Sequence, residues 1–162
     1  MALPMSRSGS TPLLRDAHAD DLPRLLQLEA MFPGDRLSVR QFRHHLRSPL
    51  ARLRVLENEG TIQGYALLLM RGNSRIARLY SIAVDPQARG TGAGRALLQD
   101  AFAQADEAAC QRLRLEVRSD NAAAIALYLK AGCQQISLLP AYYADGCDAL
   151  RFECRVSPGG TD

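Results

Sequence analysis

The amino-acid sequence predicts one α/β domain, built on a mixed β-sheet with helices on both faces. Several short segments alternate apolar and charged residues, which is the period of half-buried strands. Other segments carry an apolar residue every three or four positions, as amphipathic helices do. The two kinds of segment follow each other in the order β-α-α-β-β-β-α-β-α-β-β. A chain of 162 residues suits a single domain, expected at 11–156 between short flexible tails at 1–10 and 157–162.

The N-terminal half predicts a strand, two helices and then three strands. The first strand is expected at 11–15. Asp20 is the expected N-cap of a helix that ends before Pro33, and Ser38 is the expected N-cap of the next helix. Turn residues then separate three strands and predict antiparallel hairpins. These strands are expected at 51–57, 62–70 and 75–84, and the turns at 58–60 and 72–74.

The C-terminal half predicts a βαβ crossover. An apolar stripe indicates a helix at 93–109, and alternating residues indicate a strand at 113–117. Because strands joined by a helix run parallel, this strand should pair in parallel with the one that ends at Val84. The remaining elements are a helix capped by Asp120 or Asn121 and ended by Gly132, and two strands at 135–139 and 150–156.

Composition and charge exclude several classes of protein. Apolar residues make up 47% of the chain and charged residues 23%, and no apolar run approaches the roughly 20 residues that span a bilayer. The net charge of +3 is too small to indicate nucleic-acid binding. The N-terminus lacks the apolar core of a signal peptide, so we expect a cytoplasmic protein, as a monomer or a homodimer.

The four cysteines predict neither a metal site nor a nucleophile. Cys110, Cys133, Cys147 and Cys154 lack Cys-x-x-Cys spacing, and the three histidines all lie in the N-terminal third. In a cytoplasmic chain we expect reduced and mostly buried thiols.

The segment from Leu79 to Gly94 predicts a binding site for a diphosphate. An apolar strand ends at Val84, and three glycines follow just before a helix begins. Glycines let the main chain approach phosphate oxygens, and the first N–H groups of a helix lack partners within it. The alternative is a glycine-rich turn that only closes the crossover. Arg95 and Ala96 replace the Lys-Ser/Thr of a Walker A loop, and the fingerprint G-x-G-x-x-G finds no register, so neither nucleotide motif fits.

Three stretches instead resemble the GNAT superfamily of N-acetyltransferases. Residues 89–94, Arg-Gly-Thr-Gly-Ala-Gly, match the Arg/Gln-x-x-Gly-x-Gly/Ala pattern of its acetyl-CoA loop. LEVRSDNAAAIALYLKAG at 115–132 and AYYADGCDALRFE at 141–153 are similar to the ribosomal-protein N-terminal alanine acetyltransferases within that superfamily. The resemblance implies the GNAT-like acyl-CoA N-acyltransferase fold, and transfer of an acetyl group from acetyl-CoA to a primary amine without a metal.

The resemblance also implies roles for individual residues. Glu116 takes the place of the family's proton acceptor and Tyr128 that of its proton donor. The main chain of Ile82, Ala83 and Val84 takes the place of the segment that contacts acetyl-CoA. The other implied cofactor-binding residues are Arg89, Gly90, Thr91, Gly92, Ala93, Gly94, Arg95 and Asn121.

The chemistry of acetyl transfer explains why such residues are needed. The acceptor amine must be neutral, and an α-amino group with a pKa near 8 loses its proton more easily than a lysine with a pKa of about 10.4. A carboxylate such as Glu116 can accept that proton, directly or through water. A tyrosine hydroxyl stays protonated at neutral pH and can donate to the leaving thiolate. The N–H of Val84 is a candidate donor to the oxyanion. A peptide or protein N-terminus is therefore the favoured acceptor.

Each of these residues also has a purely structural interpretation. Glu116 can be an exposed carboxylate between Arg114 and Arg118, since it alternates with apolar residues. Tyr128 can be a core residue, and Asn121 a helix cap. Arg89 can pair with Asp85, and Tyr142 and Tyr143 can fill a sheet edge or line a substrate groove.

Other functions stay open as well. The segment 31–38 replaces the family's Pro-Trp-Ser-like segment, and the chain has no tryptophan, which puts the ribosomal substrate in question. An acetyltransferase for a small amine, or a non-catalytic acyl-CoA sensor, are the alternatives; a nucleotide-dependent oxidoreductase or kinase is a weaker one. Six arginines between 36 and 54 predict either solvated surface or a docking site for an acidic partner: Arg36, Arg40, Arg43, Arg47, Arg52 and Arg54.

Overall fold

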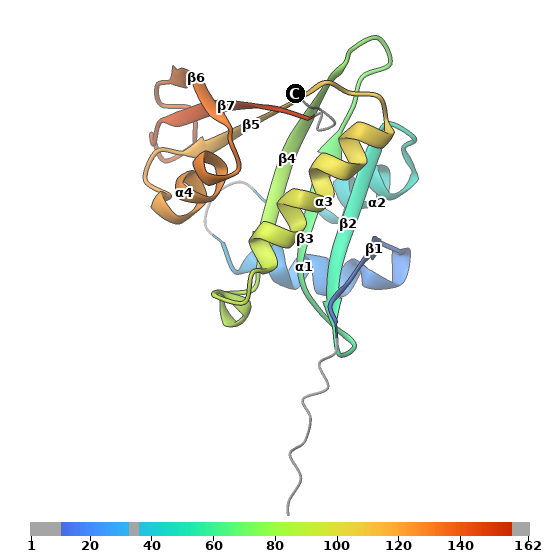
Figure 1. Ribbon diagram of the computed structural model, residues 1–162. Helices are drawn as coiled ribbons and strands as arrows, with labels where there is room; N and C mark the ends of the chain where they lie inside the picture. The colour runs from blue at the N-terminus through green and yellow to red at the C-terminus, as the bar shows by residue number, and fades with distance from the viewer. Residues whose placement is uncertain (1–10, 33–35, 157–162) are drawn as a thin grey trace, which may run out of the picture.

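Residues 11–32 and 36–156, which the computed structural model describes, form one seven-stranded sheet and the helices that cover it (Figure 1). The strands are β1 (Leu13–Asp16), β2 (Ala51–Asn58), β3 (Thr61–Leu69), β4 (Ile76–Val84), β5 (Arg112–Arg118), β6 (Gln134–Leu139) and β7 (Ala149–Arg155). The helices are α1 (Leu22–Ala30), α2 (Val39–Arg47), α3 (Ala93–Glu107) and α4 (Ala122–Lys130), with short 3-10 helices η1 (Ala19–Asp21) and η2 (Pro86–Ala88). The predicted element order is confirmed. The flexibility expected of the two tails concerns residues that lie outside this description, as do residues 33–35.

The sheet has the order β1-β2-β3-β4-β5-β7-β6 and is mixed, as predicted. Strands β1 to β4 pair in antiparallel fashion, and so do β5, β7 and β6. The crossover through α3 makes β4 and β5 the parallel pair. Two antiparallel halves therefore meet at a single parallel seam.

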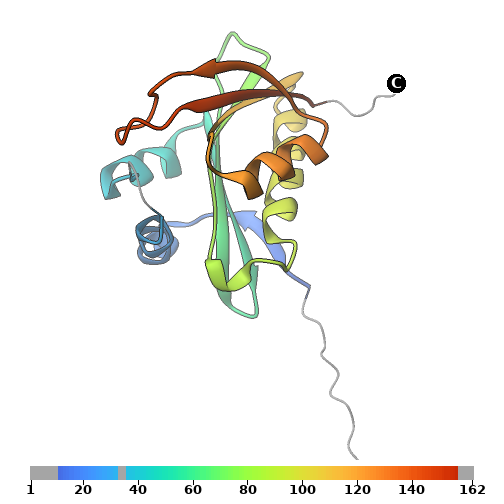
Figure 2. The ribbon, with the colours of Figure 1, turned by 90° about the vertical axis from the view of Figure 1, so that its left-hand side faces the viewer.

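Helices cover both faces of the sheet, again as predicted (Figure 2). On one face α3 and α4 bury an apolar cluster that includes Leu97, Leu98, Leu113 and Tyr128. On the other face α1 and α2 bury a second cluster around Leu25, Phe42 and Tyr65. None of the described helices could cross a bilayer, since even α3 has only 15 residues.

The predicted N-caps are confirmed at two helices and wrong at one. Ser38 caps α2 by accepting from Gln41 N, and Asn121 caps α4 by accepting from Ala124 N. Asp20 caps nothing, because the chain enters α1 through η1 instead. Asp21 is the carboxylate used there: it accepts from His18 N at 2.7 Å and pairs with Arg15.

The prediction of four reduced cysteines is also wrong. Cys133 and Cys154 form a disulfide, whereas Cys110 and Cys147 are free. The cause is the hairpin of β6 and β7, in which Gln134 lies opposite Glu153 and so brings the two neighbouring cysteines face to face. Twenty-one positions separate these cysteines, so local spacing gives no sign of the pair.

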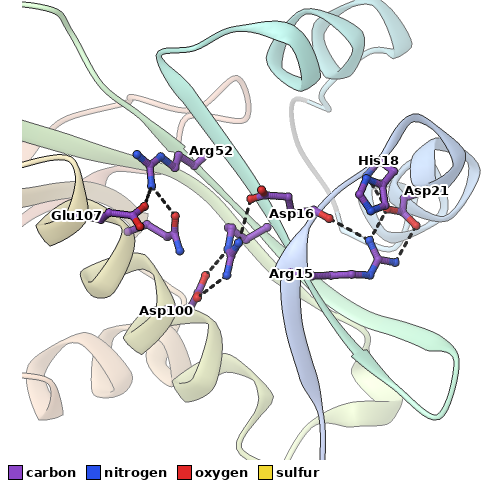
Figure 3. Close-up of polar contacts among 9 residues, drawn as sticks. Arg15, Asp16, His18, Asp21, Arg52, Asp100 and Glu107 are labelled. Carbon is purple, nitrogen blue, oxygen red and sulfur yellow. Dashed lines mark hydrogen bonds and ion pairs between the residues drawn. The ribbon is translucent and has the colours of Figure 1, made fainter.

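The arginine cluster is divided between the two faces of the sheet. Arg52 pairs with Glu107, and Arg54 pairs with both Asp100 and Asp16, so these side chains tie β2 to α3 and β1 (Figure 3). Arg40, Arg43 and Arg47 are exposed on α2 instead. The six arginines therefore do not form one docking surface.

Candidate active site

The central feature of the candidate site is the divergence of β4 from β5. Ladder pairs join them only from Ile76↔Arg112 to Arg78↔Arg114, although both strands continue further. Figure 1 shows the strands separating beyond this point. We call the strand ends that do not pair with each other, residues 79–84 and 115–118, the β4–β5 fork. Tyr80 lies at a register shift between β3 and β4, where a bulge adds twist and helps to turn β4 away.

Gly64 on β3 holds the far end of β4 in place. It pairs with Val84, and a Cβ atom built on it would lie 2.7 Å from Ala83 O and 2.9 Å from a methyl group of Leu97. Only glycine fits between β4 and α3 at this contact.

The glycine loop leads from the fork into α3. Gly90 and Gly92 have φ of 82° and 87°, the left-handed region that favours glycine. Gly92 is the N-cap of α3 and no side chain caps this helix. Within the described chain, the N–H groups of Ala93, Gly94 and Arg95 have no hydrogen-bond acceptor. Together with the helix dipole, these amides offer a site for an anion.

The side chains of the glycine loop also suit an anion. Arg89 and Arg95 are exposed, and neither pairs with a described carboxylate. Asp85, the alternative partner of Arg89, instead accepts from Gln87 N and pairs with Arg24 at 2.8 Å. The hydrogen bond from Gln87 N lowers the pKa of Asp85 the most, and the bond from Arg24 lowers it further. The pairing of Arg89 with Asp85 considered from the sequence is therefore wrong.

Glu116 lies on the α1/α2 side of β5, with a side chain only 8% exposed. Arg78 Nη2 donates to its Oε1 at 2.8 Å, and Arg151 Nε donates to its Oε2 at 2.7 Å. The sequence suggested Arg114 and Arg118 as neighbours, but these pair with Glu153 and with two aspartates. Glu116 is thus a nearly buried carboxylate between two arginines.

Tyr128 lies on the opposite side of β5. Its side chain is buried with Leu115 and Val117, and its ring centroid is 6.1 Å from that of Phe152. Its hydroxyl makes no hydrogen bond to a described residue, and burial raises its pKa, so it keeps its proton at neutral pH. A Cβ atom built on Gly94 would lie 3.6 Å from Cδ2 of the preceding Leu127, so α4 lies close to the glycine loop.

Two hollows of about 550 Å³ each lie on the Glu116 side, and Arg78 and Glu116 line both. We call the first the tyrosine groove; its lining includes Glu29, Tyr80, Ser81, Glu116, Tyr142 and Tyr143. We call the second the arginine cavity; its lining includes His45, Arg71, Arg78, Arg114, Glu116 and Arg151.

A buried network supports the floor of the tyrosine groove. The hydroxyl of the fully buried Tyr65 contacts the Glu29 carboxylate and lies 3.0 Å from Ser81 Oγ. Glu29 also accepts from Leu37 N at 2.6 Å. Burial, followed by the charge of Glu29, raises the pKa of Tyr65. The network fixes α1 and the start of α2 to β4.

Sequence reasoning missed Arg78, Arg151 and this network. Arg151 lies directly opposite Glu116 in the β5–β7 ladder. Its alternation with Leu150 and Phe152 places it on the charged face, so a known register would have identified it. Tyr65 gives no such sign, because it lies in an apolar run on β3.

The fold and the relatives of this chain identify it as an acetyltransferase. The chain belongs to the acetyltransferase (GNAT) family, whose model matches residues 15–133. It is 37% identical over 139 residues to N-alpha-acetyltransferase RimI of Mycobacterium tuberculosis, a match that covers 80% of this chain and 83% of that protein.

Two further similar proteins match very different shares of this chain. The crystal structure of the ribosomal-protein-S18-alanine N-acetyltransferase from Escherichia coli superposes with a TM-score of 0.81 and 28% identity, covering 94% of this chain and 98% of that one. An uncharacterized protein of Mycobacterium leprae is 44% identical over 92 residues, but this match spans 55% of this chain and only 25% of that protein. The resemblance seen in the sequence is confirmed.

Proposed function

We propose that the protein transfers the acetyl group of acetyl-CoA to the α-amino group of a peptide or protein N-terminus. The observation that carries the proposal is the β4–β5 fork. It has the glycine loop at the tip of β4, Tyr128 on one side of β5, and Glu116 with the tyrosine groove on the other side. The relatives named as N-alpha- and alanine acetyltransferases support an α-amine rather than a lysine as acceptor.

In this proposal, the glycine loop binds the diphosphate of acetyl-CoA. The unbonded amides of Ala93, Gly94 and Arg95 donate to the phosphate oxygens, and Arg89 adds positive charge. No Cβ blocks their approach at Gly90 or Gly92. The pantetheine arm runs along the main chain of Ile82–Val84, and Thr91 and Asn121 border the same site.

The reaction is a direct attack of the amine nitrogen on the thioester carbon, after which the carbon–sulfur bond breaks. Glu116 accepts the amine's proton, directly or through water, and exchanges one of its arginine bonds to do so. Tyr128 donates a proton to the leaving sulfur, and the N–H of Val84 stabilises the oxyanion. The products are an N-acetylated peptide and CoA with a free thiol.

One observation favours a second candidate, a non-catalytic acyl-CoA sensor. Both oxygens of Glu116 already accept from arginines, so the carboxylate has a structural role without any acceptor amine. A sensor would bind acetyl-CoA and release no thiol in response to an amine.

The test is mass spectrometry after incubation with acetyl-CoA and matched acceptors. One peptide has a free N-terminus and no lysine, its twin has a blocked N-terminus and one lysine, and a third reaction contains a small primary amine. We expect acetylation of the first peptide alone. Acetylation only of the lysine or the small amine would refute the N-terminal substrate. Thermal stabilisation by CoA, but not by NAD or ATP, with no acetylated product would support the sensor.

A further inference from the structure

The arginine cavity lies next to the proposed reaction site and has no part in the mechanism above. It shares Arg78 and Glu116 with the tyrosine groove, and its other charged residues are Arg71, Arg114 and Arg151. Four arginines against one carboxylate give this cavity a strong excess of positive charge. A hollow of about 550 Å³ with this lining suits an anionic group.

Several donors in the cavity have no acceptor among the described residues. Arg114 donates to Glu153 through Nε, and Arg151 donates to Glu116 through Nε, so neither uses its Nη groups. Arg71 pairs with no described carboxylate. A carboxylate could accept from such guanidinium groups through two parallel hydrogen bonds.

The lining of the cavity also includes His45 and apolar residues. The Nδ1 of His45 is the buried side-chain nitrogen that lacks a hydrogen-bond partner in the described chain. This nitrogen is enclosed by protein, so it is not a contact for a group that fills the hollow. Leu69 and Ile76 add apolar walls to the cavity. The cavity therefore suits a short apolar stem that ends in an anion.

We propose that the arginine cavity binds the carboxylate of an acidic side chain at the first or second residue of the acceptor. Arg71 and Arg114 are then specificity-determining residues. Glu116 lines the cavity itself, so an amine beside Glu116 lies within one or two residues of it, at about 3.5 Å per residue. This inference rests on the proposed function and names its acceptor class, an acidic N-terminus.

The test compares peptides that differ only by Asp or Asn, at position 1 or at position 2. We expect kcat/KM to be about tenfold higher for the better Asp peptide than for its Asn twin, as one charge-assisted contact would give. The double variant Arg71→Gln, Arg114→Gln should remove this preference, so that kcat/KM for the Asp peptide falls to that of its Asn twin.

Arg112→Gln is the matched control. Arg112 lies two residues before Arg114 on β5 and pairs with the same Glu153, but it does not line the cavity. It should keep the preference for Asp. Equal rates for Asp and Asn peptides, or a preference that survives in the double variant, would overturn the inference and leave the proposed function intact. Failure to acetylate any peptide would overturn both.

Discussion

The two faces of β5 differ in what holds them in place. On one face Leu113, Leu115 and Val117 are at most 5% exposed and pack against α3 and α4. On the other face Arg114, Glu116 and Arg118 are held by ion pairs to side chains of other segments. Close packing fixes the side chains of the apolar face. The charged side chains of the other face can exchange one hydrogen-bond partner for a ligand. One strand thus combines a rigid support with an adaptable surface.

Replacing Glu116 should give the largest effect, because it removes the proposed base from the charged face. We expect Glu116→Gln to lower kcat by about 10²- to 10³-fold in a thiol-release assay with a free N-terminal peptide. Glu153→Gln is the control, since Glu153 also pairs with two arginines but lines neither the tyrosine groove nor the arginine cavity. Equal losses in both variants would mean that Glu116 only organises the sheet.

Tyr128→Phe tests the apolar face and should have a smaller effect. The variant keeps the ring and removes a hydroxyl that bonds to no described residue, so thermal unfolding should not change. We expect kcat to fall by about 10- to 100-fold through the loss of a proton donor. Burial raises the pKa of Tyr128, so this donor stays protonated through neutral and mildly alkaline pH. A lower unfolding midpoint with normal kcat would identify Tyr128 as a core residue alone.

Gly92→Ala compares the glycine loop with an ordinary turn. Gly60, between β2 and β3, has nearly the same φ, 80° against 87°, and a Cβ would meet nothing within 4 Å at either position. Both substitutions should lower the free energy of unfolding by about 1–2 kcal/mol in urea titrations. Only Gly92→Ala should raise the KM for acetyl-CoA, by about tenfold. If Gly60→Ala raised KM equally, the loop would not be the cofactor site.

The smallest effect is expected far from the fork, at the pair of Arg15 and Asp21 (Figure 3). Hydrogen bonds from Arg15 hold the pKa of Asp21 below its ordinary value of 3.8. This stabilisation is complete above that value and disappears as the pH falls through the lowered pKa. Asp21→Asn should therefore cost about 1 kcal/mol at pH 7 and much less near pH 2, measured by urea unfolding. A constant cost at both pH values would contradict this account.

The sequence was most informative where local periodicity decides the structure. The alternation around Glu116 and the stripe from Ala93 to Ala105 each predict one element and its buried face, and both are confirmed. The predictions failed where a distant partner decides. Asp85 selects Arg24, and Cys133 meets Cys154, only because the sheet brings these segments together.

In the candidate site too, local motifs were predicted from the sequence and distant partners were not. The glycine loop and the candidate pair Glu116 and Tyr128 are visible in the sequence because they lie in recognisable local motifs. The arginines that hold Glu116 come from β4 and β7, on either side of β5, so their contribution depends on strand order and register. The spacing of residues along one segment gives neither the strand order nor the register.

Gly64 constrains one arm of the fork from outside it, because it lies against the end of β4. The residue faces β4 and α3 and belongs to neither hollow, yet any larger side chain there would press on the carbonyl of Ala83 and displace the strand end that precedes the glycine loop. A position outside both hollows therefore constrains the strand end that leads into the glycine loop, and a larger residue at Gly64 would require β4 or α3 to shift.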